Sequence, residues 1–395
     1  MAYDFTTLHP AYGTDQPMWK HLKEQGFDDP EVIDLGVAEM KFPLCPAIRE
    51  ATMAQAAEGT FGYSMASGDT LEAVCGWMAR RHSWQIQPDW IIQTFGIVTA
   101  VGIAIRAYTQ PGDGILVLFP SYGPFQRNVL ANDRTLVQSE LVVEDGEYRV
   151  DWADFEAKIA DPAVKAYILC NPHNPTGRVW TRAELERMGD LCVKHDVLII
   201  SDDIHFDLVF KPYVHTVLAA MKPEYARRTV TLTAPSKTFN IAGMTISNVI
   251  ISDPDLREKF EKIASLEMGH YFNAFGLAAC QAGYTGGEAW LEECLTVLKA
   301  NADYVRGFLA RHLPMLTMLE QQGTYLCWMD CRGLNMEEKE LDAFLRSAGF
   351  LSEGGAFFGE AYGRFHRVNV ACPRQYLESA LLRLEAACRA KGLVK

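Results

Sequence analysis

Three polar clusters decide the fold: Asn171-Pro-His-Asn174-Pro-Thr-Gly177, Ser201-Asp202-Asp203-Ile-His205 and Ala234-Pro-Ser236-Lys237-Thr-Phe-Asn240. Each cluster ends or directly follows an apolar or β-branched run of strand length, at 165–170, 197–201 and 229–234. Such runs are typical of strands buried on both faces, and the helical stretches between them indicate a mainly parallel sheet. Ligands bind beyond the carboxyl ends of such strands, so we expect the clusters to meet at one edge of the sheet.

The rest of the chain extends this α/β pattern. Further strand-like runs occur at 115–119 and 246–251, and the spacing of apolar residues predicts a helix over 181–195 with Thr181 as its N-cap. Beyond Tyr284 the pattern changes to a mixture of helices and strands, at 288–313, 324–329, 337–347, 367–370 and from 374 onward. We therefore predict an arm with part of a small domain (1–45), a large domain (46–284) and a small α+β domain (285–395).

Composition limits the class of protein. The chain has 395 residues, of which 49% are hydrophobic and 22% charged, as in folded water-soluble proteins. Its 37 basic and 50 acidic residues give a net charge of −13, which argues against nucleic-acid binding. The ten cysteines form no C-x-x-C pair, and the longest apolar stretch, 95–105, is too short for a membrane span. With no signal-peptide pattern, these features favour a cytoplasmic enzyme that acts on small molecules.

The clusters carry a carboxylate, an amide, a hydroxyl and a lysine, and a metal-dependent hydrolase is one reading of them. On an extended strand, Asp203, His205 and Asp207 would share a face and could bind a metal ion. That reading leaves Lys237 without a role, and so we predict no metal site. Dinucleotide binding is not favoured either, because no G-x-G-x-x-G occurs.

Taken together, the motifs resemble the fold-type I pyridoxal-phosphate (PLP) enzymes, the aspartate aminotransferase superfamily of class I/II. The resemblance covers nearly the whole chain, in matching order: Leu35-Gly-Val-Ala38, Gly62-Tyr63, Asn174-Pro-Thr-Gly177, Asp202-x-x-His205, Ser236-Lys237 and Arg367-Val-Asn-Val-Ala371. Within it the chain looks most like the cystathionine β-lyase branch of the MalY/PatB type, through Gly96-Ile-Val98, Pro120-Ser-Tyr-Gly-Pro-Phe125 and Tyr325-Leu-Cys-Trp-Met-Asp330. It implies a PLP-dependent transferase fold with a seven-stranded sheet.

The resemblance also implies how residues near the cofactor ring divide the work. Lys237 would form the Schiff base with the PLP aldehyde and, once displaced by substrate, remove the Cα proton. Asp202 would keep the pyridine nitrogen protonated, while Asn174 and His205 would contact the ring's phenolate oxygen. Tyr122 would stack on the ring.

Other residues are implied to hold the phosphate and the substrate. Gly96, Ile97 and Val98 begin a helix whose free N–H groups suit a phosphate dianion, and Ser236 would add a hydroxyl. Many superfamily members have Arg where this chain has Thr245, so Tyr63 from a second subunit would help at the phosphate in a homodimer with shared active sites. For an amino-acid substrate, Arg367 would clamp the α-carboxylate together with Asn174, beside the backbone of Ala38.

Two PLP reactions remain open on the motifs alone. A carbon–sulfur β-lyase would cleave L-cystathionine or a related cysteine S-conjugate to a thiol, pyruvate and ammonia, and the branch resemblance favours it. An aminotransferase uses nearly the same residues, and a regulatory protein of this fold is a further alternative. Lys41 and Asp203 stand where the branch commonly has Asp and Glu, and Lys41 could change which side chain the pocket accepts.

Overall fold

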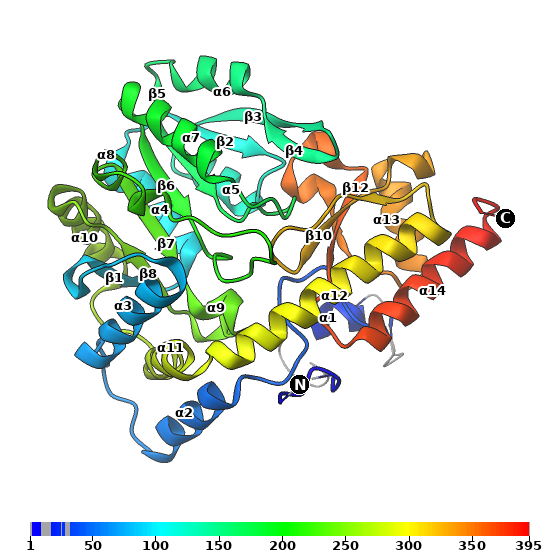
Figure 1. Cartoon of the computed structure of the whole chain (residues 1–395), viewed down its shortest axis with the longest axis horizontal. Helices are drawn as coiled ribbons and strands as arrows, with labels where there is room; N and C mark the ends of the chain where they lie inside the picture. The colour runs from blue at the N-terminus through cyan, green and yellow to red at the C-terminus, as the bar shows by residue number, and fades with distance from the viewer. Residues whose placement is uncertain (1, 9–16, 25, 28–31, 395) are drawn as a thin grey trace.

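The computed structural model describes residues 2–8, 17–24, 26–27 and 32–394 (Figure 1). In this part of the chain the larger sheet has eight strands in the order β1-β8-β7-β6-β5-β2-β3-β4. Their bounds are β1 Ile91–Thr94, β2 Gly114–Phe119, β3 Thr135–Glu144, β4 Glu147–Val150, β5 Val164–Cys170, β6 Leu198–Asp202, β7 Thr229–Thr233 and β8 Ser247–Ile250. Every strand expected in this region is present, and the α/β fold class is confirmed.

The sheet is mainly parallel but mixed. Strands β7, β6, β5, β2 and β3 pair in parallel, whereas β8 runs antiparallel to both β7 and β1. The expected seven strands are extended by an eighth, because β4 folds back on β3 as an antiparallel hairpin at the sheet edge. The carboxyl ends of β5, β6 and β7 lie side by side, which brings the three polar clusters together.

Helices cover both faces of this sheet (Figure 1). The helices of the chain are α1 Pro17–Glu24, α2 Pro46–Ala57, α3 Gly68–His82, α4 Ile97–Tyr108, α5 Gly123–Ala131, α6 Trp152–Ile159, α7 Arg182–Lys194, α8 Pro223–Ala226, α9 Pro235–Thr238, α10 Pro254–Met268, α11 Ala274–Gly286, α12 Glu288–His312, α13 Glu338–Ser347 and α14 Arg374–Ala390. Helices α4, α5 and α10 pack on one face, and α6, α7 and α8 on the other. Alternate strand residues, such as Leu116 and Val117, belong to opposite cores, as continuous apolar strands require.

Local sequence explains where the predicted helices begin. The Thr181 hydroxyl accepts the Glu184 N–H, and the Glu184 carboxylate accepts the Thr181 N–H, so a capping box opens α7 as the sequence predicts. Helix α4 begins after Gly96, whose φ of +104° is a conformation that side chains rarely adopt. None of the helices in the described ranges is long and apolar enough to cross a bilayer.

A second sheet lies beside the long helix α12, which runs from the side of α11 to α13 and α14 (Figure 1). Its strand order is β11-β12-β10-β9, with bounds β9 Thr317–Met318, β10 Leu326–Asp330, β11 Glu353–Gly354 and β12 Phe365–Asn369. These elements agree with the mixed pattern predicted beyond Tyr284. One apolar core runs continuously from α3 to α14. The domain boundaries stay a prediction, and part of the predicted arm lies outside the described residues.

Candidate active site

A cavity of about 240 Å³ lies at the carboxyl ends of β5, β6 and β7. Its lining comes from segments far apart in the sequence: Ala38, Phe95, Gly96, Ile97, Val98, Tyr122, Cys170, Asn174, Asp202, Ile204, His205, Ser236, Lys237, Ala242, Thr245 and Ile246. The three polar clusters therefore converge, as expected from the sheet. Of the predicted site residues, Arg367 and Tyr63 are not part of the lining.

Lys237 lies on α9, the single turn that follows β7. Its Nζ donates a hydrogen bond of 2.8 Å to the carbonyl oxygen of Ala38, which belongs to the arm. Burial, with a smaller contribution from the charge of Arg367, lowers the pKa of the amine to about 8. An amine with such a pKa is partly neutral at physiological pH, so it can act as a nucleophile or as a base.

Asp202 is the last residue of β6 and is 3% exposed. Its Oδ1 accepts the backbone N–H of Ile204 at 3.0 Å. Burial, reinforced by the neighbouring Asp203, raises the pKa of the Asp202 carboxyl to about 7, although Ile204 and the charge of Lys237 oppose the shift. A cation placed against this carboxylate would be strongly favoured, because it would offset the cost of burying a negative charge.

His205 and Asn174 face the same cavity. Burial, together with the charges of Lys237 and Arg367, lowers the pKa of His205 to about 3, so its ring is neutral. Its Nδ1 is buried and has no hydrogen-bond partner among the residues that the structure describes. The Asn174 Oδ1 accepts a hydrogen bond of 3.2 Å from the Nη1 of Arg367. A buried polar atom without a partner marks a place where a ligand atom can bind.

Arg367 lies on β12, behind Asn174. Its Nη2 donates to the carbonyl oxygen of Gly36 at 2.9 Å, and its guanidinium lies 4.9 Å from the ring centroid of Phe358. Within the described residues its buried Nε has no hydrogen-bond partner. Burial lowers the pKa of this guanidinium, but arginine remains charged at physiological pH. It can therefore bind a carboxylate that reaches it past Asn174.

The start of α4 forms another wall of the cavity. The Gly96 N–H donates to the Ser247 hydroxyl at 3.1 Å, so the N–H groups that follow, from Ile97 onward, are those left for an anion. Ser236 lines the same space. Thr245 follows a short 3-10 helix (Ala242–Met244) with a φ of +46° and also lines the cavity. No arginine is among the lining residues of the described chain.

The two tyrosines predicted near a cofactor are placed very differently. Tyr122 precedes α5 and lines the cavity, with its ring edge-on to Phe125 at a centroid distance of 5.5 Å. Tyr63 is 88% exposed and packs against Tyr271, with ring centroids 4.6 Å apart. Tyr63 therefore does not enter the cavity of its own chain.

Two asparagines fix the arm across the cavity, and the sequence pattern did not assign them a role. Asn240 bonds to both the N–H and the carbonyl of Met40, at 2.7 and 2.8 Å. Asn369 donates to the carbonyls of Val37 and Glu39. They hold the backbone on either side of Ala38, whose carbonyl accepts from Lys237. Asn240 follows the Ser236-Lys237 motif and Asn369 follows Arg367. Their partners are over 190 residues away in the sequence, so local sequence patterns do not reveal these contacts.

The structure does not form the metal site that Asp203, His205 and Asp207 would make in the hydrolase hypothesis. Strand β6 ends at Asp202, so the extended conformation assumed for 203–207 is absent. Asp203 accepts from the Ser201 hydroxyl, and Asp207 accepts from three side chains outside the cavity. Throughout the described ranges, no group of three or more His, Cys, Asp and Glu side chains could hold a metal ion. Lys41, which was expected to influence the substrate pocket, is buried and does not line the active-site cavity.

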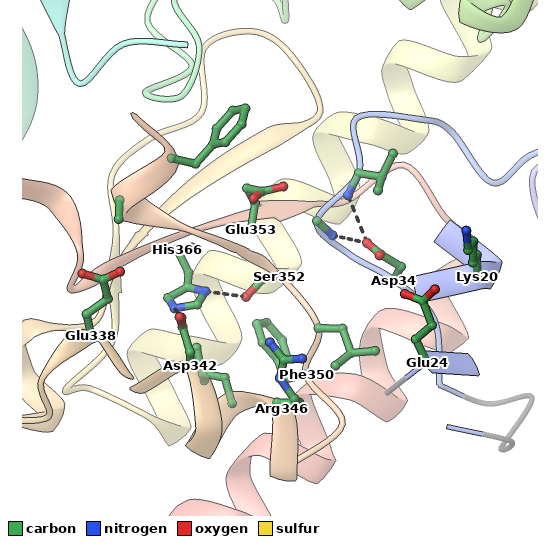
Figure 2. A pocket seen from close by; sticks show the side chains of 17 residues that line it. Lys20, Glu24, Asp34, Glu338, Asp342, Arg346, Phe350, Ser352, Glu353 and His366 are labelled. Carbon is green, nitrogen blue, oxygen red and sulfur yellow. Dashed lines mark hydrogen bonds and ion pairs between the residues drawn. The ribbon is translucent and has the colours of Figure 1, made fainter. Parts of the chain in front are cut away.

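A larger groove of about 660 Å³ is lined by residues of α1, the arm and α13 (Figure 2). Figure 2 shows Glu338, Asp342 and Arg346 from α13 facing Glu24 of α1 and Asp34 across this groove. The Asp34 carboxylate is occupied by the N–H groups of the next turn. None of the predicted cofactor or substrate residues lines this groove, so the smaller cavity is the candidate active site.

The model of the family "Aminotransferase class I and II" matches residues 30–384. The chain belongs to this family. It is 38% identical to the cystathionine beta-lyase PatB of Bacillus subtilis (strain 168), over 97% of this chain and 99% of that protein. It is 31% identical to the protein MalY of Escherichia coli (strain K12), over 98% and 99%. Cystalysin from Treponema denticola, whose crystal structure contains PLP, superimposes with a TM-score of 0.96 at 37% identity, over 99% of this chain and all of that one.

Proposed function

We propose that this protein is a PLP-dependent carbon–sulfur β-lyase that cleaves L-cystathionine or a related cysteine S-conjugate to a thiol, pyruvate and ammonia. The observation that carries the proposal is the Lys237 amine, with a pKa of about 8, in one cavity with the buried carboxylate of Asp202. The family membership and the similarity to a cystathionine beta-lyase and to PLP-containing cystalysin support it.

The residues present fit PLP. Asp202 offers an underpaired carboxylate for the ring nitrogen, and His205 offers an atom without a partner. The first turn of α4 and the Ser236 hydroxyl suit a phosphate, and Tyr122 supplies an aromatic wall. When bound, PLP supplies an electron sink that acidifies the substrate Cα–H and allows the Cβ substituent to leave.

The residues of the chain then bind the substrate and move one proton. Arg367, with Asn174, holds the α-carboxylate of the amino acid, because the guanidinium is fixed by Gly36 and its Nε remains available. The Lys237 amine accepts the proton from Cα, since burial keeps a large fraction of it neutral near pH 8. With the cofactor bound, Asp202 would face its ring nitrogen, and a positive charge there would lower the pKa of the carboxyl again.

We further propose a homodimer with shared active sites, in which Tyr63 enters the partner's cavity, and a cytoplasmic location. Support for the dimer comes from exposed apolar side chains near Tyr63, which include Phe61 and Met65. All ten cysteines are free thiols, which suits a reducing compartment. Sedimentation of the purified protein tests the dimer. A fully active monomer, or unchanged cofactor affinity in Tyr63→Phe, would contradict the shared site.

The test of the reaction uses purified PLP-loaded protein and L-cystathionine. Pyruvate and the visible absorbance of the cofactor are followed together. A β-lyase produces many equivalents of pyruvate per enzyme while the absorbance is retained. Loss of the visible band in proportion to enzyme, without catalytic pyruvate and reversed by a keto acid, would show that the protein is an aminotransferase instead.

A further inference from the structure

The buried carboxylate of Asp207 is bound by side chains from two helices, α3 and α9. Asp207 is 3% exposed, and its Oδ1 and Oδ2 each lie 3.1 Å from the Trp77 Nε1. His82 Nε2 lies 2.9 Å from Oδ1, and the Thr238 hydroxyl donates to Oδ2 at 2.7 Å. Arg81 lies at 3.7 Å and balances part of the charge. These bonds fix Asp207 between α3 and α9.

Asp207 touches none of the cavity described above. With Arg81 and His82, it instead lines a separate groove of about 630 Å³, which shares no lining residue with the cavity. Burial lowers the pKa of His82, so its ring is neutral and its Nε2–H donates to the carboxylate. The ring of His82 also stacks on Phe206 at 4.2 Å, which holds the residue before Asp207 in place. The cluster is therefore well fixed, and none of its members lines the active-site cavity.

The connection to the cavity runs through Thr238, the residue after Lys237. Helix α9 is a single turn of four residues, Pro235–Thr238, too short to hold its own orientation. Toward the cavity, Lys237 is held only by its bond to the arm carbonyl of Ala38, within the described residues. That amine must leave Ala38 to do chemistry, and the turn is then held by the residues after it. Phe239 is fully buried and Asn240 bonds to Met40, while the Thr238–Asp207 bond is the contact made by the residue next to the lysine.

We propose that Asp207 is a positioning residue for Lys237: through the Thr238 hydroxyl it fixes the turn that presents the lysine amine to the cavity. The inference rests on the proposed role of Lys237, but it does not depend on whether the reaction is elimination or transamination. A hydrogen bond from a hydroxyl to a buried carboxylate is strong, and small displacements of a reacting amine reduce rates steeply.

The test compares three variants of the PLP-loaded enzyme. Thr238→Val keeps the shape of the side chain but removes the hydroxyl, Thr238→Ser restores the hydroxyl, and Trp77→Phe removes a different donor to Asp207 while leaving Thr238 in place. Each is measured for kcat and KM, for the pH midpoint of the cofactor's visible absorbance, and for Tm without cofactor. The midpoint reports the environment of the Lys237 nitrogen directly, which a purely structural role would not move.

We expect Thr238→Val to lower kcat by about tenfold with KM changed less than about twofold, and to shift the absorbance midpoint. Thr238→Ser should recover most of both. Trp77→Phe leaves the Thr238–Asp207 bond in place, so it should lower Tm and move kcat and the midpoint in the same direction by a clearly smaller amount. The proposal is overturned if Thr238→Val leaves the midpoint and kcat unchanged, or if Trp77→Phe alters them as much as Thr238→Val does. The proposed function has a separate test in Lys237→Ala. If this variant keeps the visible absorbance of the cofactor unchanged, PLP is not bound at Lys237 and the proposed function itself is contradicted.

Discussion

Two buried carboxylates five residues apart, Asp202 and Asp207, differ in how completely they are paired. Asp207 accepts hydrogen bonds from Trp77, His82 and Thr238. Asp202 accepts the Ile204 N–H, and its pKa is raised to about 7 because burial is not compensated. Both are almost fully inaccessible to water. The difference is therefore in partners and not in burial.

The comparison between Asp202 and Asp207 shows where a ligand can bind. Nearly all buried polar atoms in folded proteins are paired, so a shortage of partners has a cause. On the cavity side the shortage is repeated at His205 Nδ1 and Arg367 Nε in the described chain. The Asp207 carboxylate, in contrast, accepts hydrogen bonds from three side chains. The cavity therefore contains buried polar atoms that need a ligand as partner, whereas the hydrogen bonds of Asp207 stabilise the fold.

The largest effect is expected at the cavity side. Lys237→Ala removes the amine that takes the Cα proton, so pyruvate production should fall by at least about a thousandfold. Its Tm without cofactor should fall little, because the Lys237 amine is a poorly compensated buried group. The measurement is steady-state pyruvate release. Retained turnover would contradict both the lysine assignment and the proposed reaction.

Asn substitutions at the two carboxylates should have opposite consequences. Asp202→Asn should reduce kcat/KM by about a hundredfold, since it removes the charge facing the ring nitrogen, and should not lower the Tm of the cofactor-free protein. Asp207→Asn should lower that Tm by several degrees, because the amide cannot accept the same set of donors. Calorimetry and kinetics on both variants check this. Equal losses of Tm in the two variants would show that the hydrogen bonds of Asp207 stabilise the fold no more than those of Asp202.

Arg367→Lys tests whether the guanidinium binds the substrate carboxylate, and its expected effect on kinetics is smaller than that of the substitutions above. A lysine keeps the charge but loses the planar fork that binds a carboxylate in two places. We expect KM for the amino-acid substrate to rise about tenfold or more, with a lesser change in kcat. Substrate-saturation curves measure it. A lowered kcat at unchanged KM would place Arg367 in another role.

How far the sequence predicted the fold depended on how deeply each strand is buried. Strands β2 and β5 were predicted because they are continuous apolar runs inside the sheet. Strands β3 and β4 at the sheet edge were missed, since their side chains are partly exposed and leave no continuous apolar run. The short β1 was missed for a similar reason.

The same limit applies to the site. The clusters around Asn174, Asp202 and Lys237 were expected to converge because parallel strands end at one edge, and they line one cavity. Their individual roles stay predictions. The anchoring of the arm by Asn240, and of α9 by Asp207, joins segments with no pattern in common. Such contacts depend on tertiary packing, which periodicity and spacing do not encode.

The smallest expected effect is a pH dependence of stability that separates the two carboxylates without any substrate. The folded-state pKa of Asp202, about 7, lies above the ordinary value near 4, so between these values the folded protein binds more protons than the unfolded chain. The free energy of unfolding of the cofactor-free protein must then fall as pH rises from about 4 to 7. Asp202→Asn removes this cost.

The Tm of Asp202→Asn relative to the unsubstituted protein should therefore rise between pH 5 and pH 8, by about 2 °C or more. The comparison stops at pH 8 because Lys237, with its pKa lowered to about 8, contributes the opposite slope above it. The matched control is Asp190→Asn, which removes a carboxylate at the surface whose pKa is lowered by Tyr225 and Lys222. Its difference should stay flat over this range, since that carboxylate is fully charged by pH 5. A flat difference for Asp202→Asn as well would mean that the carboxylate is already paired, and the contrast with Asp207 would be lost.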